Sequence, residues 1–432
     1  MAFQTRAAPQ NQAIGWLRKE CRSLGGGPVV QFPLSWMSSG ECRFIGFAMR
    51  REKRLNQGII KNVAIVVQPH QEISNGSDTK YGGVERVVTS LIEGLLNRNV
   101  DVSLYTAKKC SIDCRLIYPM GLFDGEFREN FNPTQLATYS RKIREDLENK
   151  NFDVINNHYD PITFVALQNV RTPTITTLHG PATEENVNIF GDFSECYFSA
   201  ISQAQKNSYP SNMNFVGDGF VYNSIDDNHP FSDNKRNYLL SVSRLEPIKG
   251  QKNAIKIATM CGLDLIIAGN CLDKEYFHEE IRPHLTRDLS KPEKQSERSE
   301  FINDISKYQP DVRNIIYVGE VNGHERDQLM KHAKAFLFPI EVDESFGLVL
   351  IEAGIAGTPV IAFNRGAIPE IIEQGKTGFF GNTIDDLIGF TKRTSEINPA
   401  DCREHIKKRF NNEIMVDRYL NLYRTIVAAN YA

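Results

Sequence analysis

The sequence contains no long hydrophobic run. None of its apolar stretches approaches the roughly 20 consecutive residues that a membrane-spanning helix requires, and segments such as LDLIIAG have the length of a buried strand. This absence argues against a protein built around transmembrane helices. We therefore expect no transmembrane segment, while peripheral contact with a membrane stays compatible with the sequence.

An excess of positive charge and a patterned set of cysteines are also missing. The formal net charge is -3, so nothing in the composition indicates a nucleic-acid partner. The 8 cysteines form no C-x-x-C pair, and the closest two, Cys110 and Cys114, have no second pair or histidine cluster nearby. These features argue against a zinc site and indicate reduced thiols. In a chain without a signal peptide they predict a cytoplasmic protein.

Two ligand-binding motifs are absent as well. The segment QPHQEISNGSDTKYGGVE, which follows the first expected strand, offers no G-x-G-x-x-G, which argues against a dinucleotide-dependent dehydrogenase. There is no D-x-D metal motif: Asp226-Asp227 and Asp385-Asp386 are adjacent pairs in turn-like contexts, and EVD at Glu341-Asp343 is the nearest imitation. We therefore expect neither a metal nor a cofactor.

Residues 1-60 differ from the rest of the chain. They hold nine Lys and Arg residues against three Glu, and they show neither helical nor strand periodicity. Two interpretations stay open: an organelle transit segment, or a native start at Met49 preceded by residues that are not native. On either interpretation, we expect 1-60 to be an extension that is disordered or non-native.

From Val63 onward, short apolar strands alternate with helix-length segments in two successive series, the second beginning near Tyr238. This alternation is typical of parallel sheets covered by helices on both faces. The predicted fold class is α/β, with two Rossmann-like, doubly wound domains facing one another across a cleft. The expected bounds are 61-225, joined by a C-terminal helix at 414-432, and 226-413, with a polar surface insertion at 286-312. Ligands of such sheets bind at the carboxyl ends of the strands.

Two short segments place binding groups at those strand ends. Gly82 and Gly83 precede a helix, where bare backbone N-H groups can approach an anion, although most such pairs are only flexible turns. Arg244 follows a strand, and Lys249 is expected to open the next helix. Together these two cations suit the phosphates of a nucleoside diphosphate, but they could equally be solvated surface residues.

The segment ESFGLVLIEAG holds two glutamates in apolar surroundings. With Ser345 as N-cap, a helix would run from Phe346 or Gly347 to about Ala356, leaving Glu344 in the preceding loop and Glu352 inside the helix. The N-H groups of Phe346, Gly347 and Leu348 would face the cleft. An acid in such surroundings needs a partner, and hydroxyls of a ribose or hexose would supply one. The alternative is a helix cap and a solvated face.

This run resembles the E-x7-E motif of retaining glycosyltransferases of family 4, which have the GT-B fold. Further segments agree in order and spacing, among them TTLHG, SRLEPIKG, YVGEV, AKAFLFPI and AGTPVIAFNRGAIPEIIEQGKTGF. TLHGP, GEV and FLFPI are most similar to the avilamycin-type subgroup. The resemblance covers about Val63 to Tyr423, without 286-312. It departs at Asn223-Asp226, where Ser224 replaces the usual glycine and leaves a positive-φ turn in doubt.

The resemblance implies roles residue by residue. Glu352 would bind the ribose hydroxyls and Glu344 the donor sugar, while His179 would contact that sugar near the reaction centre. Arg244 and Lys249 would take the diphosphate. Backbone groups would assist at the glycine pair and at the helix start, namely those of Gly82, Gly83, Phe346, Gly347 and Leu348. The backbone of Gly319, Glu320 and Val321 would read the base.

The expected activity is therefore metal-independent, retaining transfer of a hexose-type sugar. The donor would be a nucleoside-diphosphate sugar, by family habit a UDP-sugar, which is a co-substrate and not a cofactor. The acceptor would be a small molecule, a glycan or a lipid-linked hydroxyl compound. The alternative is a catalytically inactive GT-B module that binds nucleotide-sugar or glycan. A sugar-nucleotide epimerase of the same fold is not excluded by fold alone, but its motifs are not found.

Overall fold

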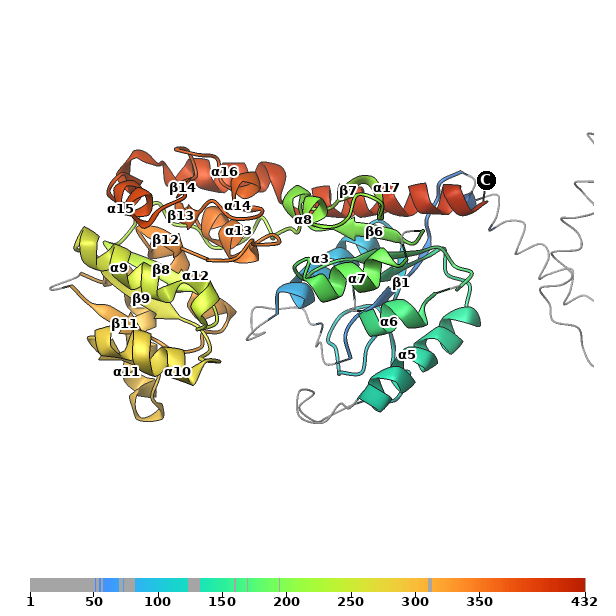
Figure 1. The fold of residues 1–432 in the computed structure, drawn as a ribbon, viewed down its shortest axis with the longest axis horizontal. Coiled ribbons are helices and arrows are strands. Elements are labelled where there is room, and N and C mark those ends of the chain that lie inside the picture. The colour runs from blue at the N-terminus through green and yellow to red at the C-terminus, as the bar shows by residue number, and fades with distance from the viewer. Residues whose placement is uncertain are drawn as a thin grey trace, which may run out of the picture. The chain divides into compact units, whose positions relative to one another are not determined.

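The computed structural model describes residues 51, 54-55, 57-69, 73, 82-122, 133-158, 161-168, 170-193, 195-309 and 313-431. The chain divides into two units, Met1–Lys53 and Arg54–Ala432. The predictions for residues 1-50 lie outside the described residues. Everything below concerns the second unit, which holds both predicted domains (Figure 1).

The N-terminal domain is built on a seven-stranded parallel sheet of order β3-β2-β1-β4-β5-β6-β7. Its central strand, in the apolar run NVAIV, is buried from Val63 onward, as a strand covered on both faces should be. The strands are β1 (Asn62–Val66), β2 (Asp101–Tyr105), β3 (Arg115–Ile117), β4 (Val154–Asn157), β5 (Thr174–Thr177), β6 (Tyr197–Ala200) and β7 (Asn214–Phe220). The helices are α3 (Gly83–Asn97), α5 (Pro133–Glu148), α6 (Pro161–Ala166), α7 (Glu184–Gly191) and α8 (Gln203–Ser208).

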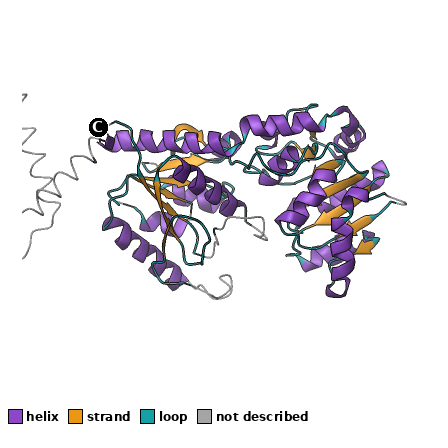
Figure 2. Cartoon of the chain, turned by 180° about the vertical axis from the view of Figure 1, so that it is seen from behind, coloured by secondary structure: helices purple, strands orange, loops and turns teal. Residues whose placement is uncertain are grey.

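The C-terminal domain repeats this plan with a second seven-stranded parallel sheet, of order β10-β11-β9-β8-β12-β13-β14. Helices flank both sheets (Figure 2). The strands are β8 (Tyr238–Val242), β9 (Asp264–Ala268), β10 (Arg287–Asp288), β11 (Ile315–Tyr317), β12 (Ala335–Phe338), β13 (Val360–Phe363) and β14 (Gly378–Gly381). The α-helices are α9 (Gln251–Cys261), α10 (Lys274–Tyr276), α11 (Gln295–Asn303), α12 (Gly323–His332), α13 (Leu348–Ile355), α14 (Ile368–Ile371), α15 (Ile384–Lys392) and α16 (Pro399–Arg409). The predicted α/β class with two doubly wound sheets is confirmed.

The last helix, α17 (Asn412–Tyr431), returns to the N-terminal domain and lies beside α3 and β7 (Figure 1). Val416 and Tyr423 of α17 are buried in the same core as Leu91 of α3. The two helices approach closely at Gly94, where any side chain would overlap Val416. The predicted return of the C-terminal helix is therefore present.

The chain passes between the domains near Ser224. The φ angle of this residue is not positive, since Asn99 is the one non-glycine residue with positive φ in the described part of the chain. The doubt raised by serine in place of glycine is therefore removed. Ser224 Oγ instead donates a hydrogen bond to Asn412 Oδ1, 2.7 Å away, and so joins the two crossing segments.

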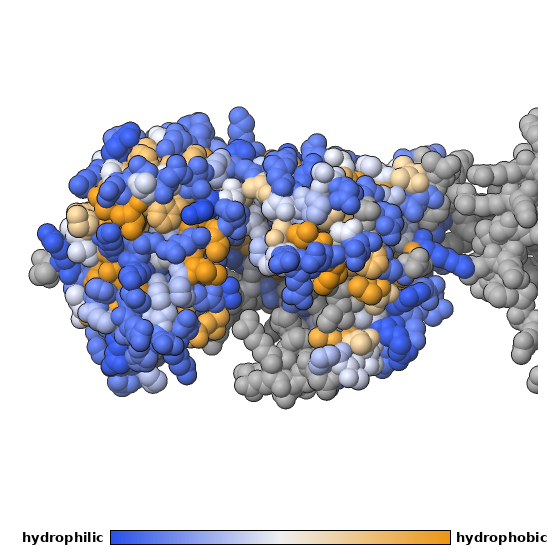
Figure 3. All heavy atoms as spheres, viewed as in Figure 1, coloured by the Kyte–Doolittle hydropathy of each residue, from blue (hydrophilic) through white to orange (hydrophobic). Residues whose placement is uncertain are grey.

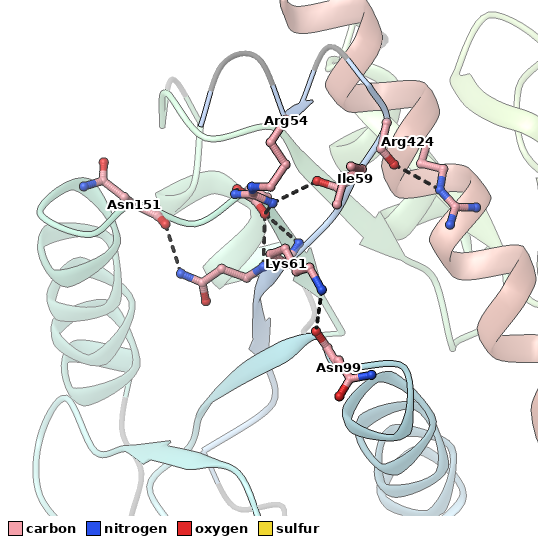
Figure 4. Close-up of polar contacts among 9 residues, drawn as sticks. Arg54, Ile59, Lys61, Asn99, Asn151 and Arg424 are labelled. Carbon is pink, nitrogen blue, oxygen red and sulfur yellow. Dashed lines mark hydrogen bonds and ion pairs between the residues drawn. The ribbon is translucent and has the colours of Figure 1, made fainter. Parts of the chain in front are cut away.

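The predicted N-terminal boundary is too late. Leu55 and Ile60 are buried in the core of the N-terminal domain, although the sequence placed both in the extension. Arg54 fixes this segment by donating to both carboxylate oxygens of Asp153, at 2.6 and 2.7 Å, and to the carbonyl of Ile59 (Figure 4). The folded domain therefore includes residues that precede β1.

The predicted surface insertion is likewise part of a core. Within 286-309, β10 pairs with β11, and Leu289, Ile302 and Ile305 are fully or almost fully buried. Residues 310-312 lie outside the described residues. The polar composition misled the prediction because apolar residues are sparse here but all point inward.

The described surface gives no sign of a membrane span. Hydrophilic residues cover most of the described part of the face shown in Figure 3, and apolar residues form separate patches. None of the helices in the described residues combines the length and hydropathy needed to cross a bilayer.

Candidate functional site

A pocket of about 340 Å³ lies where the carboxyl ends of strands from both domains meet. Parallel α/β sheets bind ligands at such edges. The pocket gathers most of the predicted site residues, namely Gly82, Gly83, His179, Lys249, Glu320, Val321, Glu344, Phe346, Gly347, Leu348 and Glu352. Arg244 and Gly319 are not among its lining residues.

Glu344 is held in a loop that is tied down at its backbone. Its carbonyl accepts a hydrogen bond from the amide of Ala367 at 2.8 Å. Gly366, with a φ of 54°, packs so tightly against the backbone of Glu344 that a Cβ there would overlap it. The carboxylate itself lies 3.7 Å from the Lys249 ammonium. The loop therefore presents an acid and a cation side by side in the pocket.

The helix was predicted to start at Phe346 or Gly347 with Ser345 as its N-cap, and it starts slightly later. The helix α13 begins at Leu348, its N-cap is Gly347 with a φ of 87°, and no side chain caps it. Ser345 is therefore not the cap; its carbonyl accepts from Ser202 Oγ of the N-terminal domain at 2.6 Å. The amide of Phe346 points to the Glu344 carboxylate, 3.5 Å away. A left-handed glycine ends the loop where the sequence suggested a hydroxyl cap.

Glu352 is 2% exposed and lies in the second turn of α13. Its partners are arginines: Arg86 of α3 forms an ion pair with Oε1, and Arg326 Nε of α12 lies 3.4 Å from Oε2. Burying a carboxylate requires such compensation. The sequence reading missed both arginines. The position of Arg86, in the first turn of the helix that follows the glycine pair, was the signal that could have found one of them.

The two predicted phosphate cations differ in placement. Lys249 lines the pocket, whereas Arg244 lies 3.3 Å from Glu246. The prediction that Lys249 opens the next helix is wrong. Lys249 ends the short 3-10 helix Pro247–Lys249, and α9 begins at Gln251. The turn depends on Gly250, whose φ is 74° and whose missing side chain leaves room for a backbone carbonyl.

His179 follows β5 and pairs with a second histidine. Its Nε2 lies 2.8 Å from Nδ1 of His158, which follows β4 and is 3% exposed. Burial lowers the pKa of His179 to about 4. Burial and the neighbouring His179 also lower the pKa of His158 well below its usual value. Both rings are therefore neutral at physiological pH, and they share one hydrogen bond between the ends of β4 and β5.

The glycine pair permits close contact between the domains. Gly82 has a φ of 153°, and the side chain of Glu85 folds against it. Burial raises the pKa of Glu85. A Cβ on Gly83 would lie 3.1 Å from a methyl group of Leu348 in α13. The absence of side chains at the glycine pair therefore lets α3 approach the start of α13.

The segment Gly319-Val321 follows β11 and is fixed by Arg298. This buried guanidinium donates to the carbonyls of Val318 and Glu320, at 2.6 and 2.7 Å, and to the Glu325 carboxylate. Glu320 and Val321 reach the main pocket, while Gly319 lines an adjoining cavity of about 330 Å³. The sequence did not single out Arg298, because it lies in the segment interpreted as an insertion.

The fold and pocket together define a class of protein. Two doubly wound domains present carboxylates beside cations at their strand ends, an arrangement that suits an anionic ligand bearing hydroxyl groups. Residues 81–211 match the family model "Glycosyltransferase Family 4", and residues 224–387 match "Glycosyl transferases group 1". The two models fall on the two domains in chain order. The chain belongs to the family 4 type of glycosyltransferases, with the GT-B fold.

Individual relatives agree with this assignment. The chain is 34% identical over 125 residues to sulfoquinovosyl transferase SQD2 of Arabidopsis thaliana, covering 27% of this chain and 24% of that protein. It is similar in structure to AviGT4, a glycosyltransferase of avilamycin A biosynthesis, with a TM-score of 0.57, 20% identity, and coverage of 85% and 98%. It is also similar in structure to Anabaena Alr3699/HepE in complex with UDP and glucose, with a TM-score of 0.59, 16% identity, and coverage of 84% of this chain and 98% of that chain. The matches to the first curated relatives span 24% to 33% of their lengths.

Proposed function

We propose that the protein transfers a hexose-type sugar from a nucleoside-diphosphate sugar to a hydroxyl acceptor, with retention of configuration and without a metal. The observation that carries the proposal is the convergence of Glu344, Glu352 and Lys249 in one pocket at the strand ends. Glu352 binds the ribose hydroxyls and Glu344 the sugar hydroxyls. Lys249 takes the diphosphate, with Arg244 joining it once donor is bound.

The chemistry follows from where charge develops. As the bond between the anomeric carbon and the diphosphate oxygen breaks, negative charge grows on the leaving group, and Lys249 stabilises it. The acceptor oxygen attacks the same face, and its proton passes to the departing phosphate oxygen. The neutral His179 donates or accepts a hydrogen bond at the sugar and carries no charge. This division of labour needs no protein base.

The donor proposed is a UDP-sugar. The structural similarity to a protein crystallised with UDP and glucose supports this choice, as does the segment Glu320-Val321 at the pocket edge. The acceptor, a small molecule, a glycan or a lipid-linked compound, binds the N-terminal domain, and the reaction takes place in the cytoplasm. Peripheral membrane contact would accompany a lipid-linked acceptor.

A thermal-shift panel tests donor recognition, with UDP, GDP, ADP, dTDP and their glucose conjugates as probes. We expect the uridine compounds to raise the midpoint most. Hydrolysis of the stabilising donor is then measured with and without EDTA, and the anomeric configuration of the released sugar is read by NMR. Loss of turnover with EDTA would refute the metal-free mechanism, and an inverted product would refute retention. Binding of nucleotide-sugar without any turnover would instead indicate an inactive GT-B binding module.

A further inference from the structure

The ion pair between Arg86 and Glu352 joins the two domains through the proposed donor site. Arg86 projects from the first turn of α3 in the N-terminal domain, and Glu352 lies in α13 of the C-terminal domain. The glutamate side chain is 3% exposed, whereas that of the arginine is 35% exposed. Of the two groups, the arginine can therefore move into solvent at far lower cost.

Arg86 is anchored at a second point near the pocket. Its Nε donates to the carbonyl of Gly82, 3.3 Å away, so the guanidinium is oriented across the glycine pair toward α13. Arg326 contacts the other carboxylate oxygen of Glu352 from α12, within the C-terminal domain itself. The two arginines thus have different consequences: Arg326 compensates the buried charge inside one domain, and Arg86 links the domains.

A ribose diol requires the same carboxylate. Two vicinal hydroxyls donate to the two oxygens of a glutamate, and Oε1 of Glu352 is already engaged by Arg86. The guanidinium is a stronger partner for a carboxylate than one neutral hydroxyl. Ligand and arginine therefore compete for one oxygen.

We propose that Arg86 is a donor-affinity residue that occupies the ribose-binding oxygen of Glu352 in the unliganded protein and is displaced by the ribose hydroxyls. The inference rests on the proposed donor site. Displacement removes one bond between the domains when donor binds, and re-forming that bond favours release of the nucleoside diphosphate. Removal of Arg86 therefore strengthens recognition of the diol.

The first experiment uses no ligand. A double-mutant cycle of Arg86→Gln and Glu352→Gln is measured by urea unfolding, and the expected result is that the two effects are not additive. Additive effects would overturn the inference regardless of any nucleotide. Because Glu352→Gln removes one of the two carboxylates beside Arg326 and could impair folding, Arg86→Lys provides a second route: it should retain part of the coupling that Arg86→Gln loses.

The second experiment compares UDP with 2′,3′-dideoxy-UDP by calorimetry. Both ligands carry the diphosphate, so any contact of Arg86 with phosphate cancels in the ratio of their Kd values. In Arg86→Gln the preference for UDP should exceed that of the wild type by about threefold to tenfold. An unchanged ratio would refute the competition. Failure of UDP to bind the wild type would refute the uridine donor, and the ligand-free cycle would then still decide the ion pair.

The matched control is Arg98→Gln, which removes a charge from the other end of α3. Arg98 pairs with Glu413 and Asp417 of α17, away from the pocket. Its removal should leave the UDP preference at the wild-type value. A similar rise in both variants would assign the effect to the charge of α3 and contradict the specific role of Arg86.

Discussion

The pair of His158 and His179 should make the N-terminal domain sensitive to mild acid. His179 has a pKa of about 4 in the folded protein, against 6.5 for an unperturbed histidine. Between these values the unfolded chain binds a proton that the folded chain does not. The contribution to stability is therefore fully present above pH 6.5 and is lost as the pH falls toward 4.

The magnitude follows from the two pKa values. At pH 5 nearly every unfolded chain carries the proton and few folded chains do, so His179 alone lowers the free energy of unfolding by about 2 kcal/mol relative to pH 7.5. His158, whose pKa is also lowered by burial, acts in the same direction. The loss precedes the titration range of ordinary carboxylates, which separates it from general acid denaturation.

Urea unfolding monitored by circular dichroism at pH 7.5 and pH 5 measures this effect in the wild type and in His179→Gln. We expect the variant to lose about 2 kcal/mol less than the wild type over this interval. Hydrogen exchange of peptides around β5 localises the change to the N-terminal domain. Identical pH dependence in both proteins would refute the lowered pKa of His179.

Three further predictions concern the loops around the pocket. Gly366→Ala should cost about 1–3 kcal/mol in thermal unfolding, because the added methyl displaces the Glu344 loop. It should lower turnover more than it weakens binding of UDP, since UDP lacks the sugar that Glu344 is proposed to hold. Lys249→Met should weaken UDP binding about tenfold or more by calorimetry, whereas Lys252→Met, which changes an exposed side chain of α9, should leave it unchanged; equal effects would contradict a specific diphosphate contact. Arg298→Met should destabilise the protein by about 3 kcal/mol in urea, because it removes the cationic partner of Glu325 and the side-chain donor to two carbonyls; a change below about 0.5 kcal/mol would contradict this.

The sequence was sufficient for the fold and for most of the pocket, and the reason is local. Strands such as NVAIV are uniformly apolar because both faces of a parallel sheet are buried, and that pattern is legible without a structure. Glu344 and Glu352 could be recognised because acids in apolar runs are costly. Both turned out to line one pocket.

The errors arose where long-range contacts decide. Arg298 lies in a polar stretch whose few apolar residues reach the core, and only the tertiary structure shows that its guanidinium holds the backbone after β11. In the sequence, nothing distinguishes Arg86 from other arginines in helices, because its ion pair with Glu352 of α13 is visible only in the tertiary structure. The prediction of the start of α13 was wrong for a different reason: Gly347, in a left-handed conformation, is the N-cap, and Ser345 is not.

The distribution of charge explains why two acids are compatible with an anionic donor. Glu352 is compensated by Arg86 and Arg326 before any ligand arrives, and Glu344 lies beside Lys249, so neither carboxylate stands as an isolated negative charge in the pocket. A diphosphate entering the site therefore meets three cations against these two acids. On the proposed displacement of Arg86 by ribose hydroxyls, Lys249 and Arg326 remain in the pocket as cations beside the bound donor. On the proposed function, the acids therefore select hydroxyl groups, while their arginine and lysine partners keep the site receptive to phosphate.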